Sequence, residues 1–166
     1  NTVSRLGEIK QSVSSDPVLG VMRDADMEGT AAPDFSIEDL DGNTVTLSDY
    51  EGGVVLLDFW ATWCGPCVKE TPTFIALHEQ YGEDEFKIIG LAVRDTESKV
   101  RSYAEKEGIQ FSLAMVSDDV QDDYGGIMGL PTHFLIDKQG VIRHVWMGGP
   151  TDLRTFQERI DNLLAE

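Results

Sequence analysis

The chain has 166 residues, 41% of them hydrophobic, and its 30 acidic against 13 basic side chains give a formal charge of −17. This length supports one well-buried domain rather than two. The negative charge argues against electrostatic binding to nucleic acid or to an anionic membrane surface, and no segment has the length of a transmembrane helix.

The first 32 residues are polar and only weakly periodic, and they end in Gly29-Thr30-Ala31-Ala32-Pro33. We therefore expect residues 1–32 to be a flexible leader or linker that buries little surface, followed by one domain over residues 33–166. A helix within residues 3–13 is an alternative. Since the chain begins at Asn1 rather than at methionine, the removal of an export signal or a membrane anchor also stays open.

The domain begins with a predicted hairpin. Residues 35–37 and 44–47 have strand character and flank a turn at Asp41-Gly42-Asn43. The acidic residues of this turn could suggest a calcium loop, but the glycine comes too early for the spacing of an EF-hand. A turn between short strands explains the segment better.

A strand and a helix follow the hairpin. Residues 54–59 form a nearly continuous apolar run, which predicts a strand covered on both faces. Residues 64–81 have helical spacing, and residues 86–93 form a second apolar run that predicts another buried strand.

The second half of the domain alternates helices and strands. Helices are predicted at 97–107, ending at Gly108, and at 118–124, capped by Ser117. Strands are predicted at 111–116, 133–136 and 141–147, and a last helix at 152–164 with Thr151 as its cap. This order predicts an α/β sandwich built on a mixed sheet.

The two cysteines of the chain stand close together in Trp63-Cys64-Gly65-Pro66-Cys67, between a predicted strand and a predicted helix. Cys64 would lie at the helix start, where the dipole and the unpaired amide N–H groups favour thiolate over thiol. Pro66 suits the first turn, because its missing N–H costs nothing there. Cys67 lies one turn further and can close a small ring onto Cys64. The pattern predicts a redox-active dithiol.

Two other interpretations of the cysteine pair fit less well. A zinc site needs about four ligands, and His78, His133 and His144 are isolated in the sequence. A purely structural disulfide across so short a loop would restrain the unfolded chain far less than one that closes a long loop.

Residues 57–67, Leu-Asp-Phe-Trp-Ala-Thr-Trp-Cys-Gly-Pro-Cys, closely resemble the active-site strand and turn of thioredoxins. Pro72 matches the kinking proline of that family, and Gly129-Leu130-Pro131-Thr132 resembles the segment that carries its cis-proline opposite the dithiol. The resemblance implies a thioredoxin-like α/β fold, with a mixed central sheet and helices on both faces. It also implies thiol–disulfide oxidoreductase activity, for which we expect no cofactor.

Other segments resemble a narrower branch, the exported thioredoxin-like reductases of cytochrome c maturation. Ala32-Pro33-Asp34-Phe35, Cys67-Val68-Lys69-Glu70 and residues 134–140 match the pattern of that branch. The resemblance covers about residues 33–165. It implies an N-terminal hairpin extension and an additional strand and helix, at 111–124, before the cis-proline. Gly65-Pro66 and Asp58 match general thioredoxins instead, so the physiological substrate stays open.

The resemblance assigns roles to individual residues. Cys64, as the exposed N-terminal cysteine, is expected to attack substrate disulfides, and Cys67 to resolve the mixed disulfide; swapped roles fit less well. Pro131, expected in the cis form rather than as an ordinary trans turn proline, would leave nearby backbone free to pair with an extended substrate. The residues expected to bind substrate are Trp63, Gly65, Pro66, Leu130 and Thr132.

Two acidic residues are candidates for proton transfer. Asp58 lies in an apolar run, where a carboxylate is costly unless it is paired or has a function. We expect it to accept a proton near Cys67, with a satisfied structural acid as the alternative. Glu70 is either a second member of this site or part of a solvated helix face. His133 could face the site, but a histidine on the sheet surface is the favoured interpretation.

We therefore expect a thiol–disulfide oxidoreductase that reduces protein disulfides, such as that of apocytochrome c, in the periplasm or another extracytoplasmic compartment. Its expected partners are protein disulfides and an upstream, membrane-bound thiol–disulfide reductant, and we expect a monomer. A general thioredoxin-like reductase is the first alternative. A peroxiredoxin fits less well, because Ala61 stands where that family's motif has threonine. A non-catalytic copper or haem carrier is the remaining alternative.

Overall fold

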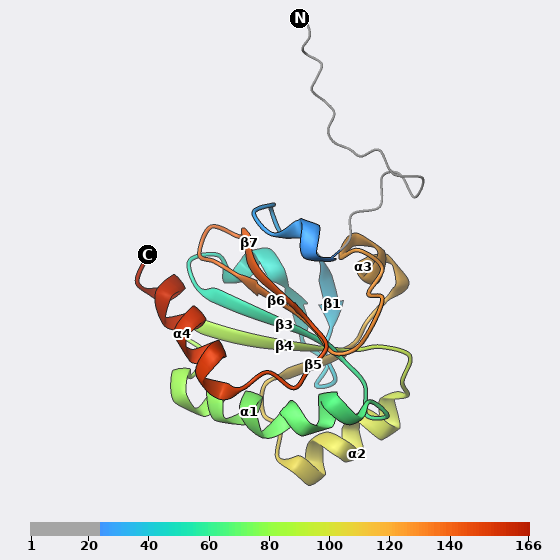
Figure 1. Cartoon of the computed structure of the whole chain (residues 1–166). Helices are drawn as coiled ribbons and strands as arrows, with labels where there is room; N and C mark the ends of the chain where they lie inside the picture. Colours follow the sequence, from blue (N-terminus) through green and yellow to red (C-terminus); the bar gives the residue numbers. More distant parts are fainter. Residues whose placement is uncertain (1–23) are drawn as a thin grey trace, which may run out of the picture.

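A five-stranded mixed sheet forms the centre of the computed structural model, which describes residues 24–166 (Figure 1). The strand order is β5-β4-β3-β6-β7. Strands β3 (Val54–Trp60), β4 (Phe86–Ala92) and β5 (Ser112–Met115) run parallel. Strand β6 (Thr132–Ile136) is antiparallel to β3, and β7 (Ile142–Met147) is antiparallel to β6. The predicted mixed sheet is confirmed.

The two faces of the sheet are covered by different elements (Figure 1). Helices α1 (Gly65–Tyr81), α2 (Glu97–Glu107) and α4 (Leu153–Leu164) bury their apolar side chains on one face. The other face is covered by β1 (Ser36–Glu38), β2 (Thr44–Thr46), α3 (Asp118–Asp123) and two 3-10 turns, η2 (Asp24–Met27) and η3 (Leu47–Tyr50). The hairpin extension and the inserted strand and helix before Pro131 are therefore confirmed.

The alternation of side chains along β3 decides where the polar residue of this strand lies. Successive side chains of a strand point to opposite faces. Leu56 and Trp60 belong to the core layer beneath α1, whereas Leu57 and Phe59 belong to the opposite layer. Asp58, between them, therefore points toward α1. The same rule places His133 on this face, since Phe134 faces the other way.

The cap of the last helix differs from the prediction. Asp152, and not Thr151, is the N-cap of α4, and its side chain accepts a hydrogen bond from Thr155 N at 2.9 Å. Asp and Thr are both good N-cap residues, so the sequence alone allowed either. Thr151 N instead donates to Glu70, as described below.

The last residues of the predicted leader are part of the packed domain. Met27 is 4% exposed and belongs to the core layer opposite α1. Gly29 N donates to Ile142 O, and Ile142 N donates to Thr30 O, so this segment pairs with the start of β7. The expectation that residues up to 32 bury little surface therefore does not hold for Met27, whereas Glu28, Gly29 and Ala31 are exposed. The alternative helix within 3–13 lies outside the described residues. Within residues 24–166, no helix has the length and apolar character needed to cross a membrane.

Candidate active site

The two cysteines form a disulfide at the start of α1, with their Cα atoms 5.3 Å apart. Cys64 is the N-cap residue, and its Sγ accepts a hydrogen bond from Cys67 N at 3.2 Å. Pro66 lies in the first turn, as predicted. A sulfur at this position faces amide groups that have no partner within the helix, and these stabilise negative charge. The predicted strand–turn–helix setting of the dithiol is confirmed.

The exposure of the two sulfur-bearing residues differs from the expectation. Cys64 is only 6% exposed and Cys67 is 3% exposed. In the disulfide form Cys64 is therefore not the exposed residue that the sequence predicted. The preference for Cys64 as the nucleophile depends on its N-cap position, because Cys67 lies one turn deeper in the helix.

Apolar surface borders the dithiol on the side of Trp63. This side chain is 55% exposed, and its ring nitrogen donates to Arg94 O at 2.8 Å. The Arg94 guanidinium lies over the indole ring, 5.8 Å from its centre. These contacts hold a large apolar side chain in the solvent next to Cys64. Trp60, in contrast, is 3% exposed and belongs to the core.

The loop before β6 contains the predicted cis-proline. The Leu130–Pro131 peptide bond is cis. Thr132, expected to bind substrate, is fully buried, and its hydroxyl donates to Gly129 O at 2.7 Å. Its side chain therefore stabilises the loop from the buried side. A Cβ atom on Gly149 would lie 3.0 Å from Pro131 Cγ and 2.7 Å from Glu70 Oε2, so the cis-proline and α1 approach one another there.

Asp58 lies beneath the first turns of α1. It is 5% exposed, and its Oδ1 has no hydrogen-bond partner among the described residues. Asp58 and Thr71 line one small cavity, and the Thr71 hydroxyl contacts Cys67 O at 3.5 Å. Burial raises the pKa of Asp58, a rise that His133 opposes and the charge of Glu70 increases. A buried carboxylate with a raised pKa is suited to exchanging protons near neutral pH.

Glu70 is not on a solvated face of the helix. It is 1% exposed and lies on the buried side of α1, one turn after Cys67. Its Oε1 lies 2.8 Å from His133 Nε2, and its Oε2 accepts a hydrogen bond from Thr151 N at 2.6 Å. Glu70 therefore connects the helix that carries the dithiol to β6 and to the loop before α4.

His133 is the residue that sequence reasoning placed wrongly. It is fully buried and not on the sheet surface. Its Nδ1 lies 3.1 Å from Asp58 Oδ1, while its Nε2 faces Glu70. The rings of Phe74 and Phe156 pack against the imidazole edge to face, with ring centres 5.1 and 5.6 Å away. A sequence signal existed, because His133, like Asp58, stands in an otherwise apolar strand. This signal did not reveal that the two strands pair.

The charges of this cluster favour a protonated histidine. Burial by itself lowers the pKa of His133, but Asp58 and Glu70 outweigh it and raise the pKa to about 9. At neutral pH an imidazolium therefore lies between two carboxyl groups. Within residues 24–166, no group of three or more His, Cys, Asp or Glu side chains is arranged to hold a metal ion.

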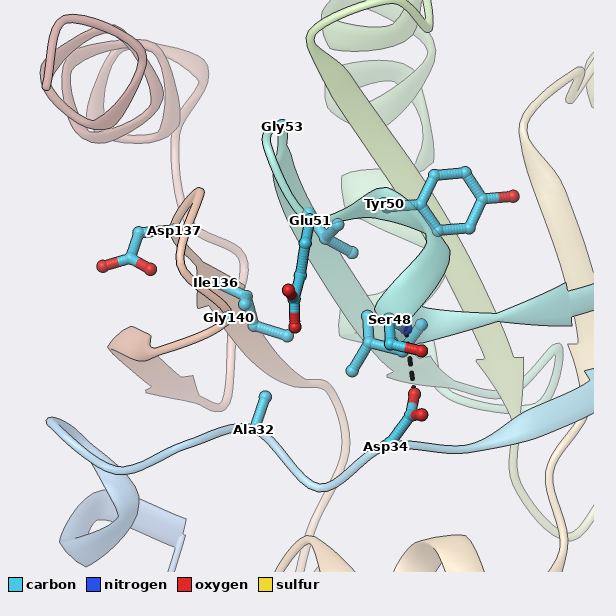
Figure 2. Close-up of a pocket in the computed structure, with 11 residues that line it drawn as sticks. Ala32, Asp34, Ser48, Tyr50, Glu51, Gly53, Ile136, Asp137 and Gly140 are labelled. Carbon is cyan, nitrogen blue, oxygen red and sulfur yellow. Dashed lines mark hydrogen bonds between the residues drawn. The ribbon is translucent and has the colours of Figure 1, made fainter.

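A second hollow lies at the far end of β3, near Gly53 and Val55 (Figure 2). Three carboxylates line it, those of Asp34, Glu51 and Asp137, and two of them are engaged in local structure. Asp34 accepts a hydrogen bond from Ser48 N at 2.9 Å, and Asp137 contacts Arg143 at 3.1 Å. The two cysteines lie beyond the opposite end of the same strand. This hollow is therefore not part of the redox site.

The part of the chain that matches known proteins includes this site. The AhpC/TSA family matches residues 29–145, a range that contains the dithiol, Asp58, Glu70 and His133. The thiol-disulfide oxidoreductase ResA of Geobacillus thermodenitrificans is 36% identical, over 80% of this chain and 77% of that protein. The thioredoxin-like protein YneN of Bacillus subtilis is 33% identical, over 81% of this chain and 79% of that protein.

Solved structures agree with these relatives. A thiol:disulfide interchange protein of the thioredoxin family from Chlorobium tepidum superimposes with a TM-score of 0.77 at 29% identity, over 84% of this chain and 99% of that chain. A putative thiol:disulfide interchange protein DsbE from the same organism has a TM-score of 0.75 at 31% identity, over 82% and 97% of the two chains. The predicted thioredoxin-like fold is confirmed.

Proposed function

Because the chain belongs to the AhpC/TSA family and is a thiol–disulfide oxidoreductase, we propose that it reduces protein disulfides outside the cytoplasm, such as that of apocytochrome c. The observation that carries the proposal is the Cys64–Cys67 pair at the start of α1, above a buried carboxylate. Support for the narrower role comes from the resemblance of residues 33–165 to the exported reductases of cytochrome c maturation.

The first step of the proposed reaction is attack by Cys64. In the reduced protein its thiolate attacks one sulfur of the substrate disulfide and forms a mixed disulfide, while the other substrate sulfur leaves as a thiolate and takes up a proton. The N-terminal end of α1 favours the thiolate form of Cys64. Exposed Trp63, together with Gly65, Pro66 and Leu130, would provide the surface on which the substrate chain lies, and Pro131 would leave nearby backbone free to pair with it.

The second step is resolution by Cys67. Its thiol loses a proton to Asp58, and the thiolate attacks Cys64 Sγ, which releases the substrate's second thiolate and leaves the Cys64–Cys67 disulfide. Two electrons have then moved to the substrate. Its first thiolate takes a proton from the solvent, which had received the Cys64 proton, and its second thiolate takes up the Cys67 proton from Asp58. An upstream thiol–disulfide reductant, membrane-bound in our proposal, must return the pair to the dithiol form. We propose that the protein acts as a monomer.

A general thioredoxin-like reductase of broad specificity is the second candidate. It is favoured by Gly65-Pro66 between the cysteines, a pair that matches general thioredoxins. The two candidates share the reaction and differ in the range of substrates. Turnover of an apocytochrome c disulfide and of insulin, compared at equal enzyme concentration, separates them.

The direction of the reaction is tested by the reduction potential. Gly65-Pro66 predicts a potential of about −270 mV, as in thioredoxin, rather than about −120 mV, as in a strong oxidant. Equilibration with glutathione buffers, followed by alkylation and mass analysis, measures it. A value near the oxidant end would make the protein a disulfide donor and would overturn the proposed direction.

A further inference from the structure

His133 has no role in the mechanism proposed so far, although it touches both carboxyl groups of the site. Strand β3 supplies Asp58, helix α1 supplies Glu70, and strand β6 places His133 between them. The residues Asp58 and His133 are direct partners in the register of the two antiparallel strands. Three separate elements thus meet in one charged cluster on the buried side of the dithiol.

The surroundings of the cluster isolate it from solvent. Side chains of His133 and Glu70 are fully buried, and that of Asp58 is 7% exposed. Phe74 and Phe156 close the two sides of the imidazole. Charges in such a place interact strongly, because little water is present to screen them. A change of charge on one group must therefore alter the proton affinity of the other two.

We infer that His133 is a positioning residue of the redox reaction, which holds Asp58 and Glu70 as one proton-sharing unit and thereby sets the pH range in which Cys67 resolves the mixed disulfide. The inference deepens the proposed function and rests on the resolving role of Cys67. Glu70 is one turn from Cys67 on the same buried helix face, where residues three apart are neighbours.

The sign of the effect follows from the charges. With an imidazolium present, Asp58 and Glu70 are balanced by one cation, and Asp58 stays available as a base at lower pH. Without it, two buried carboxylates face each other, and the pKa of Asp58 rises further. The other titratable groups here are the two cysteines at the start of α1 and Tyr103 of α2. Burial and the charges of Glu107 and Asp58 raise the pKa of Tyr103, and its contact with Thr71 opposes this rise. Replacing His133 should thus move resolution to higher pH.

Ellman's reagent separates the two chemical steps in a single turnover of the reduced chain. Attack by Cys64 forms a mixed disulfide and releases one nitrothiobenzoate. Resolution then transfers the proton of Cys67 to Asp58, forms the Cys64–Cys67 bond and releases the second nitrothiobenzoate. Stopped-flow absorbance at a series of pH values gives a pH profile for each phase.

The test compares His133→Gln with the wild type and with His144→Gln. His144 lies on β7, opposite Leu135, and is a histidine near the same sheet face without a carboxylate contact of this kind. We expect the second phase of His133→Gln to shift by about one pH unit or more to higher pH, which slows it about tenfold at pH 7. The first phase of that variant, and both phases of His144→Gln, should keep the wild-type profile.

Each other outcome overturns a distinct claim. An unchanged second phase in His133→Gln, or an equal shift in His144→Gln, would overturn the role of His133 while leaving the proposed function intact. A wild-type chain with no second phase, or a Cys67→Ser chain that keeps it, would overturn the proposed function and this inference with it.

A measurement on the wild type keeps the test valid if His133→Gln fails to fold. Nitrogen NMR of the reduced chain reports the protonation of both imidazole nitrogens of His133. We expect both to carry protons from pH 6 to 8, as an imidazolium between two carboxylates should. A neutral imidazole at pH 7 would overturn the inference.

Discussion

Asp58 and His133 lie directly opposite each other on β3 and β6, with 3.1 Å between Oδ1 and Nδ1. The two atoms approach without the alignment of a hydrogen bond. Both side chains face α1, in a largely apolar layer that also contains Glu70 and Thr71. The contact therefore places a charged pair in the core immediately beneath the dithiol helix, where its protonation is coupled to both the stability of the fold and the chemistry of Cys67.

The pH dependence of stability should report on His133. Its folded pKa is raised from 6.5 to about 9, so the protonated form stabilises the native state. This contribution is fully present below pH 6.5 and is lost as the pH rises through about 9. At about 1.4 kcal/mol per unit, it amounts to about 3 kcal/mol. Urea unfolding between pH 6 and 9.5 should show this loss in the wild type and a smaller loss in His133→Gln. Equal slopes of the unfolding free energy against pH in the two proteins would contradict the assignment of this loss to His133.

Asp58→Asn should slow resolution more than attack, because the variant removes the acceptor for the Cys67 proton. Because it also removes one of the two carboxyl contacts that keep His133 protonated, the variant should be more stable than the wild type only above about pH 9, where His133 is neutral. The raised folded pKa means that the native state holds the Asp58 proton more tightly than the unfolded state, so ionisation destabilises the fold as pH rises above the unfolded value. Stopped-flow tryptophan fluorescence across pH measures the rates. An unchanged profile would count decisively against this acid.

The matched control for that prediction is Glu70→Gln. The glutamine keeps an oxygen that can accept the hydrogen bond from Thr151 N, and Glu70 contacts His133 rather than Asp58 in the cluster. We therefore expect a smaller shift of the resolution profile than in Asp58→Asn. A larger shift would make Glu70 the principal proton acceptor.

Gly149→Ala should disturb the site from the loop before α4. A Cβ atom there would lie 2.7 Å from Glu70 Oε2 and 3.0 Å from Pro131 Cγ, and the Glu70 carboxylate is held by His133 and Thr151 N. Such overpacking costs about 1–3 kcal/mol. Gly129→Ala, where nothing lies within 4 Å of the new atom, is the control. Thermal unfolding should show a clear loss for the first variant only; equal melting temperatures would show that the loop yields freely.

Met27→Ala tests whether the segment before residue 33 belongs to the domain. Met27 is 4% exposed, and truncating a buried methionine costs about 2–5 kcal/mol. Met128 is 84% exposed, so the unfolding free energy of the control Met128→Ala should stay within about 0.5 kcal/mol of the wild type. Deletion through Thr30 should likewise lower the melting temperature, contrary to what the polar sequence suggested. An unaffected deletion variant would return this segment to the role of a leader.

The regular elements were predictable because their signals are local. The apolar run of β3, the helix that follows the dithiol, the end of α2 at Gly108 and the capping of α3 by Ser117 each depend on residues close together in the chain. The cis-proline and the hairpin extension were expected from the resemblance, and the structure contains both.

The residues whose positions were predicted wrongly are placed by contacts between distant parts of the chain. His133 is 63 positions from Glu70, and its burial follows from the pairing of β6 with β3, which periodicity cannot reveal. Met27 is apolar but stands among polar neighbours, so no pattern marked it. It is buried because residues 29–32 pair with the start of β7. The local sequence allows either Thr151 or Asp152 as the cap of α4; in the structure Asp152 is the cap, and Thr151 N donates to the distant Glu70.

The central claim, reduction of a substrate disulfide by Cys64 with resolution by Cys67, is tested most directly by trapping. Reduced Cys67→Ser is mixed with insulin, alkylated, and analysed by peptide mass spectrometry, with Cys64→Ser treated in parallel. We predict that Cys67→Ser accumulates a mixed disulfide through Cys64, since no resolving thiol remains, and that Cys64→Ser neither forms an adduct nor reduces insulin. Trapping through Cys67 in Cys64→Ser, or substantial turnover by that variant, would contradict the account.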